Sequence, residues 1–437
     1  MKKLIILILC AVSLESTAQD RNVFWAHGLN SDGDFWNTEY ARAQRDFRIR
    51  SRGFSYPTNE GVPAYADRLR SGSSAIKGSQ TIAIGHSMGA VGIREADRDD
   101  SGLYGGMITF GGPLDGARIA NEVIAGTPID RFVANSIETM RRGPIASDAR
   151  SKWRVFVNGV NDVVRGDGLS AILRTFASAP ILDVTEDLTG GFNQVIRDNY
   201  DPNSPSVRDL AEGSAYFNTI RNYASSKPKI FAWGDEDSPV HIRMFISSIT
   251  FDNNFSNLLL TTYNQVANGY KAAADGIDTG GGLFCWSKCK EEKRREKEAW
   301  NVGYDYVNRG WEIAWNQLTD ARFLERYTTT ERVYKCDGNG PLRPQPLEPI
   351  DCQYPGDDCG GCYWVTETVT RTRWVNQPSD GLIKQSSQIG EVSRWGGQAA
   401  RLDGVNHLEM GIHPETNELL ERAFRGGYNP FFTTSRR

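Results

Sequence analysis

One five-residue segment, Gly85–Gly89 with the sequence Gly-His-Ser-Met-Gly, constrains this chain more than any other feature. It follows a short apolar run at 81–84 and precedes a stretch that can form a helix. A turn from a strand into a helix, with glycines on both sides, tolerates the strained backbone that exposes a serine hydroxyl. This spacing also arises by chance in glycine-rich chains. The functional interpretation therefore depends on the position of the segment between a predicted strand and a predicted helix. We therefore expect Ser87 to be an activated nucleophile.

The rest of the pattern predicts an α/β fold whose sheet is mostly parallel and has helices on both faces. Short apolar segments alternate with helical ones, which is typical of parallel strands joined by helices. We expect strands at 22–26, 47–56, 81–84, 103–110, 153–158, 229–233 and 399–405, and helices at 63–76 and 415–424.

A long stretch, about 245–395, breaks this alternation and is interpreted as a helical, Cys-rich cap insertion. The core is then formed by residues 19–244 and by 396–437, which supply the last strand, a histidine loop and the terminal helix. Within the insertion we expect helices at 251–274 and 288–323 and an edge hairpin at 366–375.

The second of these helices is amphipathic and carries Trp300, Trp311 and Trp315. As a hypothesis, the insertion caps the active site, and these tryptophans shape an acyl pocket or make transient contact with a lipid surface. Helical aromatic stripes usually pack inward, however, so the favoured interpretation is that they form the core of the insertion itself.

The N-terminus has the pattern of a secretory signal peptide over residues 1–18. Lys2 and Lys3 precede the apolar run 4–12, and small residues at positions 16 and 18 precede Gln19. The run is too short to serve as a permanent membrane anchor. We expect export, so that the mature protein is secreted or periplasmic.

Six cysteines remain once the signal peptide is removed, and an exported protein meets an oxidising compartment. Up to three disulfides are expected, and the sequence does not choose among their pairings. A zinc site that includes the pair Cys359 and Cys362 is the alternative. The six cysteines are Cys285, Cys289, Cys336, Cys352, Cys359 and Cys362.

Composition sets the remaining limits on partners and cofactors. With a formal net charge of −4, 39% hydrophobic and 24% charged residues, the chain has the composition of a soluble globular protein. It has no global basic field that would favour nucleic acid. No dense run of oxygen ligands indicates calcium, and we expect no metal or other cofactor. Oligomeric state does not follow from the sequence.

Acyl transfer by a serine also needs a general base, and the best candidate is His407. It lies on a loop after the last predicted strand, where the chain order serine, acid, histidine puts the base. His86 adjoins the serine, so its side chain is expected to point away from the hydroxyl. His241, between a strand and a helix, is the rival, and His413 is expected at the surface.

The base needs a carboxylate that orients it, and the residues alone leave several candidates. A buried carboxylate fixes the imidazole tautomer, so it belongs on a strand-end loop near the base. Asp235 and Asp237 follow one predicted strand, and Asp162 follows another. Aspartate is also a common turn residue, so neither position is specific.

Two backbone N–H groups are expected to form an oxyanion hole. The segment His27-Gly28-Leu29 ends the first predicted strand, and Met88 follows the serine directly. The N–H groups of Leu29 and Met88 would face the negative oxygen that develops during acyl transfer. His27 itself is interpreted as a structural hydrogen-bonding residue rather than a base.

These segments together resemble the bacterial lipase and esterase branch of the α/β hydrolases, including relatives of the inositol-deacylase-like proteins. The resemblance is carried by Ala26–Leu29, Ile84–Gly89, Gly404–Leu408 and Asp209–Ser214. It covers about residues 21–245 and 398–425, and its order of segments favours Asp237 as the acid. The segment Phe110–Gly116 departs from the Gly-Thr-Pro-His that this branch usually carries, and the insertion is unusually long.

The resemblance implies an exported serine hydrolase of carboxylic esters, including lipid or other acyl esters, that acts through Ser87, His407 and Asp237. An exported peptidase or acyltransferase on the same fold is the first alternative. A non-catalytic binding protein that acts through its Cys-rich insertion is the second.

Overall fold

A computed structural model describes residues 20–126, 201–249, 311–336, 362–391 and 394–436, together with isolated positions between 257 and 304. Contacts divide the chain into two compact units. One is Met1–Ala321 with Gln377–Arg437, and the other is Arg322–Asn376.

Several predictions lie outside the described residues, namely the signal peptide at 1–18, the strand at 153–158, Asp162, and the cysteines Cys285, Cys352 and Cys359. The described positions within 251–274 and 288–304 are helical, as predicted. Among the described residues, no helix is both long enough and apolar enough to cross a membrane.

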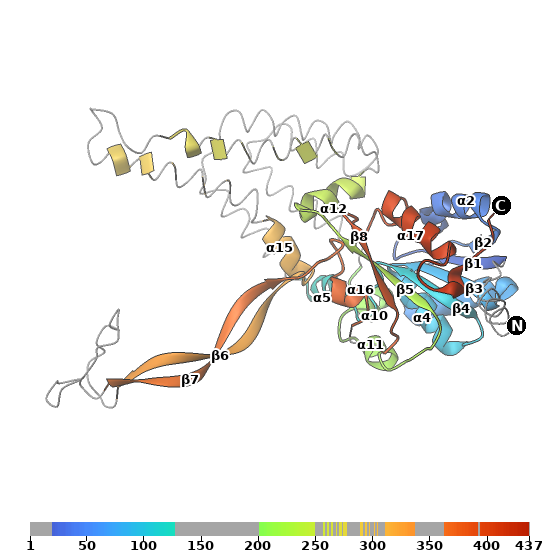
Figure 1. The fold of residues 1–437 in the computed structure, drawn as a ribbon, viewed down its shortest axis with the longest axis horizontal. Helices are drawn as coiled ribbons and strands as arrows, with labels where there is room; N and C mark the ends of the chain where they lie inside the picture. Colours follow the sequence, from blue (N-terminus) through green and yellow to red (C-terminus); the bar gives the residue numbers. More distant parts are fainter. Residues whose placement is uncertain are drawn as a thin grey trace, which may run out of the picture. The chain divides into compact units, whose positions relative to one another are not determined.

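The first unit is built around a six-stranded sheet in the order β2-β1-β3-β4-β5-β8 (Figure 1). Every neighbouring pair of strands is parallel, which confirms the predicted parallel sheet. The strands are β1 (Arg21–Ala26), β2 (Ile49–Gly53), β3 (Gly78–His86), β4 (Tyr104–Phe110), β5 (Lys229–Asp235) and β8 (Gln398–Asp403).

Helices cover both faces of this sheet, and successive residues of its strands therefore enter two different hydrophobic cores. On β1, Phe24 belongs to one core and Val23 to the other, as the two-residue period of a strand requires. The first core takes side chains from α3 (Val62–Ser73), α4 (Met88–Asp99), α5 (Arg118–Ala125), α10 (Pro205–Leu210) and α11 (Ala215–Ile220). The second takes them from α2 (Asn37–Asp46) and α17 (Pro414–Phe424).

The other described helices of the first unit are α12 (Val240–Ile249), α15 (Trp311–Leu318) and the short α16 (Gln385–Gln388). Helix α16 contacts β5, and α12 contacts α15. Single 3₁₀ turns complete the described elements at Gly33–Trp36, Ser74–Ile76 and Pro430–Phe432.

The helix predicted at 288–323 runs too far. Helix α15 ends at Leu318, and Asp320 has a positive φ of 57°, a conformation that no α-helix continues through. From Arg322 the chain pairs with another strand instead. The amphipathic pattern did not reveal this end, because the residues beyond it are still apolar at helical spacing.

The second unit is a two-stranded antiparallel hairpin of β6 (Arg322–Cys336) and β7 (Cys362–Asn376). Residues 366–375, predicted as an edge hairpin, all lie in the one strand β7, and their partner is β6. Arg373 pairs with Glu325 directly opposite at 2.7 Å, and its guanidinium lies 5.1 Å from the ring centroid of Tyr327. Such cross-strand pairs stabilise a two-stranded ribbon.

The hairpin register also predicts one disulfide. Backbone pairing sets Cys336 directly opposite Cys362, and opposed residues on antiparallel strands have Cα atoms about 4.5–5.5 Å apart, within the range of a disulfide. We expect mass spectrometry of a non-reduced digest of exported protein to recover a linked peptide pair containing both residues. A link from either cysteine to another part of the chain would contradict this pairing.

A second prediction concerns Glu39 on α2, which is 2% exposed and whose Oε1 has no hydrogen-bond partner among the described residues. Burial raises its pKa from 4.5 to about 7, with a smaller opposing effect from Arg42. The folded state therefore holds this proton to a higher pH than the unfolded chain does. Stability is expected to fall as the pH rises from about 4.5 to 7.

Replacing Glu39 by Gln is expected to remove this loss and to raise the free energy of unfolding at pH 8 by up to about 3 kcal/mol. Urea unfolding at several pH values measures the effect. The exposed Glu418→Gln is the matched control, because its side chain is not desolvated. An equal response of both variants to pH would show that burial of Glu39 is not the cause.

Candidate active site

Ser87 lies on the tight turn between β3 and α4, as predicted. Its φ of 54° and ψ of −126° are strained for a residue with a side chain, and its N–H donates to the carbonyl of Phe110 at 3.0 Å. Glycine is required on both sides of the serine, because neither position has room for a Cβ. A Cβ at Gly85 would lie 2.7 Å from the backbone of Gly89, and a Cβ at Gly89 would lie 2.6 Å from the carbonyl oxygen of Ala26. The half-buried serine is therefore held at the carboxyl edge of the sheet.

The two predicted oxyanion donors lie in segments that adjoin this serine. Met88 is the first residue of α4, so its N–H has no acceptor within the helix. Gly28, which precedes Leu29, packs against the serine itself. A Cβ there would lie 2.8 Å from Ser87 Cβ and 3.3 Å from Ser87 Oγ.

His27 is a structural residue, in agreement with its interpretation from sequence. Its Nε2 accepts a hydrogen bond from the N–H of Tyr56 at 3.1 Å, so the proton is on Nδ1, which donates to the carbonyl of Gly28 at 3.1 Å. Burial lowers its pKa below the usual value, and the neutral ring is thereby favoured. This bond fixes the peptide plane that carries the N–H of Leu29.

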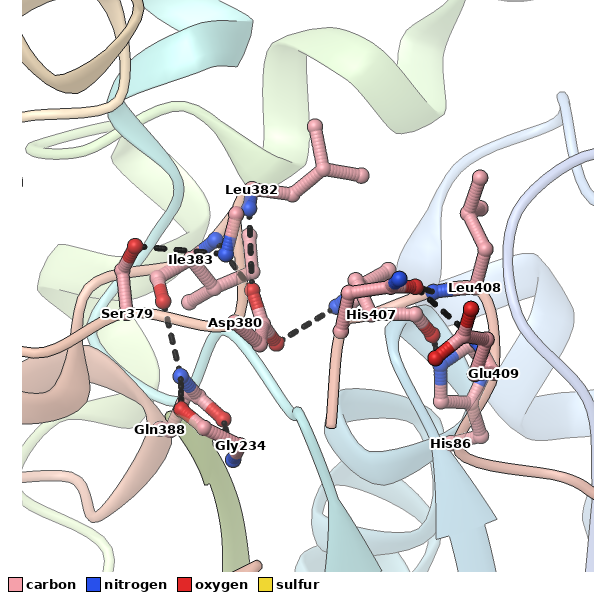
Figure 2. Close-up of polar contacts among 12 residues, drawn as sticks. His86, Gly234, Ser379, Asp380, Leu382, Ile383, Gln388, His407, Leu408 and Glu409 are labelled. Atoms are coloured by element: carbon pink, nitrogen blue, oxygen red, sulfur yellow. Dashed lines mark hydrogen bonds and ion pairs between the residues drawn. The ribbon is translucent and has the colours of Figure 1, made fainter. Parts of the chain in front are cut away.

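His407 follows β8 on the predicted loop and is paired with a buried carboxylate. Its Nδ1 lies 2.7 Å from Oδ2 of Asp380, and its backbone N–H donates to the carbonyl of Asp380 at 2.8 Å (Figure 2). The ring is only 4% exposed. The neighbouring Asn406 stabilises the loop, since its Oδ1 accepts the N–H groups of Leu408 at 3.0 Å and Glu409 at 3.2 Å.

The Asp380 carboxylate is fully buried, and backbone donors hold it in place. Its Oδ1 accepts the N–H groups of Leu382 at 3.0 Å and Ile383 at 2.7 Å, which leaves Oδ2 to His407. Figure 2 shows this carboxylate between its own loop and the imidazole. Burying a charge in this way is tolerated only with such partners.

The Asp380 loop is attached to the carboxyl end of β5 by a buried glutamine. The Oε1 of Gln388 accepts the N–H of Gly234 at 3.0 Å, and its Nε2 donates to the carbonyl of Ile383 at 2.7 Å (Figure 2). In addition, the N–H of Glu236 donates to the carbonyl of Ser379 at 2.8 Å. The loop therefore packs at the end of β5, which is where the sequence analysis expected an acid from the residues directly after that strand.

The predicted acid, Asp237, is not paired with the histidine. It is exposed, and its N–H donates to Oε1 of Glu236, whereas Asp235 forms an ion pair with Arg401 at 2.6 Å. Among the described contacts, neither carboxylate reaches His407. Sequence reasoning passed over Asp380 because it lies inside the stretch interpreted as a cap. The Ser-Asp-Gly turn signal at 379–381 and the order serine, acid, histidine were the available clues.

The other histidines are engaged elsewhere. His413 is half-buried and caps α17, accepting the N–H of Glu415 on Nδ1 at 3.2 Å, so it is not the free surface residue that was expected. His241 on α12 is buried, which lowers its pKa to about 3. His86 contacts the carbonyl of His407 rather than a carboxylate.

The serine and histidine segments meet at Gly111, the residue after β4. Ser87 donates its N–H to the preceding residue, Phe110. A Cβ at Gly111 would lie 3.0 Å from His407 Nδ1 and 2.9 Å from Asp380 Oδ2, and its φ of 56° also favours glycine. The segments that carry Ser87, His407 and Asp380 thus converge on one edge of the sheet. Within the described part of the chain, no group of three or more His, Cys, Asp or Glu residues is arranged to hold a metal ion.

One of the predicted aromatic residues of the insertion supports this edge. Trp315 on α15 is 5% exposed, and its Nε1 donates to the carbonyl of Gly381 at 2.7 Å, next to Asp380. It packs in the first hydrophobic core, so this tryptophan faces inward. Trp300 lies outside the described residues, as does the side chain of Trp311.

Comparison with known proteins gives structural similarity only. No protein-family model and no curated protein sequence matches the chain. A thermophilic esterase from Thermogutta terrifontis is 16% identical over 56% of this chain and 78% of its own, with a TM-score of 0.25. An epoxide hydrolase from Bacillus megaterium is 11% identical over 50% and 78%, with a TM-score of 0.23. The type II thioesterase of the borrelidin biosynthetic cluster is 13% identical over 53% and 80%, with a TM-score of 0.25.

The fold itself gives the classification. A parallel sheet with helices on both faces carries a serine on a strained strand-to-helix turn. A buried Asp–His pair lies at the same carboxyl edge, and the order along the chain is serine, acid, histidine. This architecture is that of the α/β-hydrolase fold.

Proposed function

We propose that this protein is an exported serine hydrolase that cleaves carboxylic esters, those of lipids or other acyl compounds. The observation that carries the proposal is the buried Asp380–His407 pair at 2.7 Å, on the edge of the sheet where Ser87 is held in a strained turn. A strained serine beside an oriented imidazole is the arrangement that acyl transfer requires.

In the proposed reaction Ser87 Oγ attacks the acyl carbon while His407 Nε2 takes its proton. The developing oxyanion accepts hydrogen bonds from the N–H groups of Leu29 and Met88. In comparable sites each such donor contributes about 3 kcal/mol of transition-state stabilisation. The ester C–O bond then breaks, and the imidazolium returns the proton to the leaving alcohol. Water, activated by the same imidazole, hydrolyses the acyl-enzyme and regenerates the serine. The mechanism uses no metal or other cofactor.

Asp380 replaces Asp237 as the proposed acid. A carboxylate on Nδ1 keeps the proton on that nitrogen, so that Nε2 is free to act as the base, and it stabilises the imidazolium. Asp380 is in contact with Nδ1, whereas Asp237 is exposed beside Glu236.

Export to the periplasm or the medium is part of the proposal and rests on the signal-peptide pattern at 1–18 alone. Transient contact with a lipid surface would need residues other than Trp315, because that side chain is buried.

Labelling with a fluorophosphonate probe tests the nucleophile and the base. We expect labelling of the wild-type protein and none of Ser87→Ala, because the probe bonds to an activated serine oxygen. His407→Ala is expected to react far more slowly, since the serine loses its base. Labelling that persists in Ser87→Ala would refute the assignment, and failure of the folded wild-type protein to react would refute the proposed function.

The acid assignment is tested by two matched substitutions assayed on a p-nitrophenyl ester. Asp380→Asn is expected to lower kcat by about 10⁴-fold, because the amide favours the wrong imidazole tautomer. Asp237→Asn serves as the control and is expected to remain within about twofold, as is usual for exposed sites without a role. The reverse result would return the role to Asp237. Faster turnover of matched amides than of esters would favour a peptidase.

Gly28→Ala tests the oxyanion segment. The new methyl group would lie 2.8 Å from Ser87 Cβ, so the serine or the segment carrying Leu29 has to shift. We expect kcat/KM to fall by about 100-fold or more, the size of a lost oxyanion donor, without loss of the fold by circular dichroism. Gly396→Ala, where a Cβ meets nothing within 4 Å, is the control. Equal activity of the two variants would contradict this tight packing.

A further inference from the structure

We propose that His86 is a positioning residue that holds the His407 loop against the nucleophile turn and thereby sets the distance between base and serine. The inference rests on the proposed function for its kinetic test, and on geometry alone for its spectroscopic test.

The central contact is a buried hydrogen bond from His86 to the backbone of the base. His86 Nε2 lies 2.9 Å from the carbonyl oxygen of His407, and the ring is 4% exposed. A carbonyl only accepts, so Nε2 carries the proton. Burial, with a smaller effect from His407, holds the pKa of His86 well below its usual value, so the ring stays neutral. His86 is therefore a permanent donor and does not compete with His407 as a base.

Aromatic neighbours fix the plane of this ring. Phe35 stacks on it with centroids 4.2 Å apart, and Trp36 meets it edge-on at 6.4 Å. The ring of His407 itself lies 4.7 Å away, tilted by 46°. A ring held on these sides has little freedom to turn, so its N–H points constantly at the carbonyl of His407.

With the hydrogen bond from His86, His407 is held by two different segments of the chain. The acid loop holds its N–H and Nδ1 through Asp380, and the turn holds its carbonyl through His86. Since His86 is covalently next to Ser87, this hydrogen bond is a direct connection between the base and the nucleophile segment. A displacement of about 1 Å between reacting groups can cost about 10²-fold in rate.

The stability of the fold alone does not explain why a histidine occupies position 86, because one of its ring nitrogens is unpaired. Its Nδ1 is buried without a hydrogen-bond partner among the described residues, which is unfavourable for a polar atom. It lies 3.1 Å from the point where a Cβ of Gly28 would be. An apolar side chain would avoid this cost, so a histidine here is best explained by what its Nε2 does.

Three substitutions of His86 in the full chain separate the effect of a hydrogen-bond donor that reaches the carbonyl from the effect of side-chain size. Gln carries its amide nitrogen about as far from the backbone as His carries Nε2, whereas Asn, with the same chemistry, stops one bond short. Leu has no donor. We expect His86→Asn and His86→Leu to lower kcat on a p-nitrophenyl ester by about 10–100-fold with KM within about threefold, as expected of misplacement rather than lost substrate binding. His86→Gln is expected to recover most of the rate.

A second readout does not depend on activity. The proton between His407 Nδ1 and Asp380 is expected to give a low-field ¹H NMR signal in the wild-type protein and in His86→Gln. We expect it to broaden or disappear in His86→Asn and His86→Leu while circular dichroism remains native. Folded Asn and Leu variants with an unchanged kcat and an unchanged signal would overturn the proposal, whatever their melting temperatures.

The two readouts also separate this inference from the proposed function. If the wild-type protein is not labelled by fluorophosphonate while the low-field signal depends on His86 as described, ester hydrolysis fails and the positioning role stands. If the wild-type protein hydrolyses esters and neither readout responds to His86→Asn, the positioning role fails alone.

Discussion

The structure of the site depends on one buried interaction, the hydrogen bond between Asp380 and His407. A carboxylate with no exposed surface is tolerated only where donors compensate its lost hydration, and here two backbone N–H groups and an imidazole do so. Because those donors belong to two loops, each loop has to be fixed independently. Gln388 holds the acid loop to β5, and Trp315 holds the same loop to α15.

This arrangement gives the insertion a role in assembling the site. The acid does not follow β5 directly but arrives after helices and a hairpin, on a loop that returns to the end of that strand. Residues 377–390, interpreted from sequence as part of the cap, thus supply the carboxylate of the pair. Ser87, Asp380 and His407 still follow one another in the order serine, acid, histidine that is common in α/β hydrolases.

Much of the fold was predictable because its signals are local. The apolar runs of the parallel strands, the glycines around Ser87 and the loop that carries His407 are each visible within about ten residues of sequence. The acid was not predictable in this way. Asp237 and Asp380 both lie in turn sequences, and only tertiary contacts such as the hydrogen bond of Gln388 to Gly234 distinguish them. The end of α15 at Leu318 was missed for a similar reason, since the helical pattern continues beyond it and only the pairing of β6 with β7 shows that the chain is extended there.

The sequence by itself determined the sheet, the strained serine turn and the histidine that serves as the base candidate. Backbone sterics and the two-residue period of strands act over short distances and leave their mark in residue types. Only the tertiary structure decided which carboxylate meets His407 and that His86 donates to the carbonyl of the base. Both contacts join residues distant in the chain, and their energy depends on burial and donor geometry, which exist only once the chain has folded.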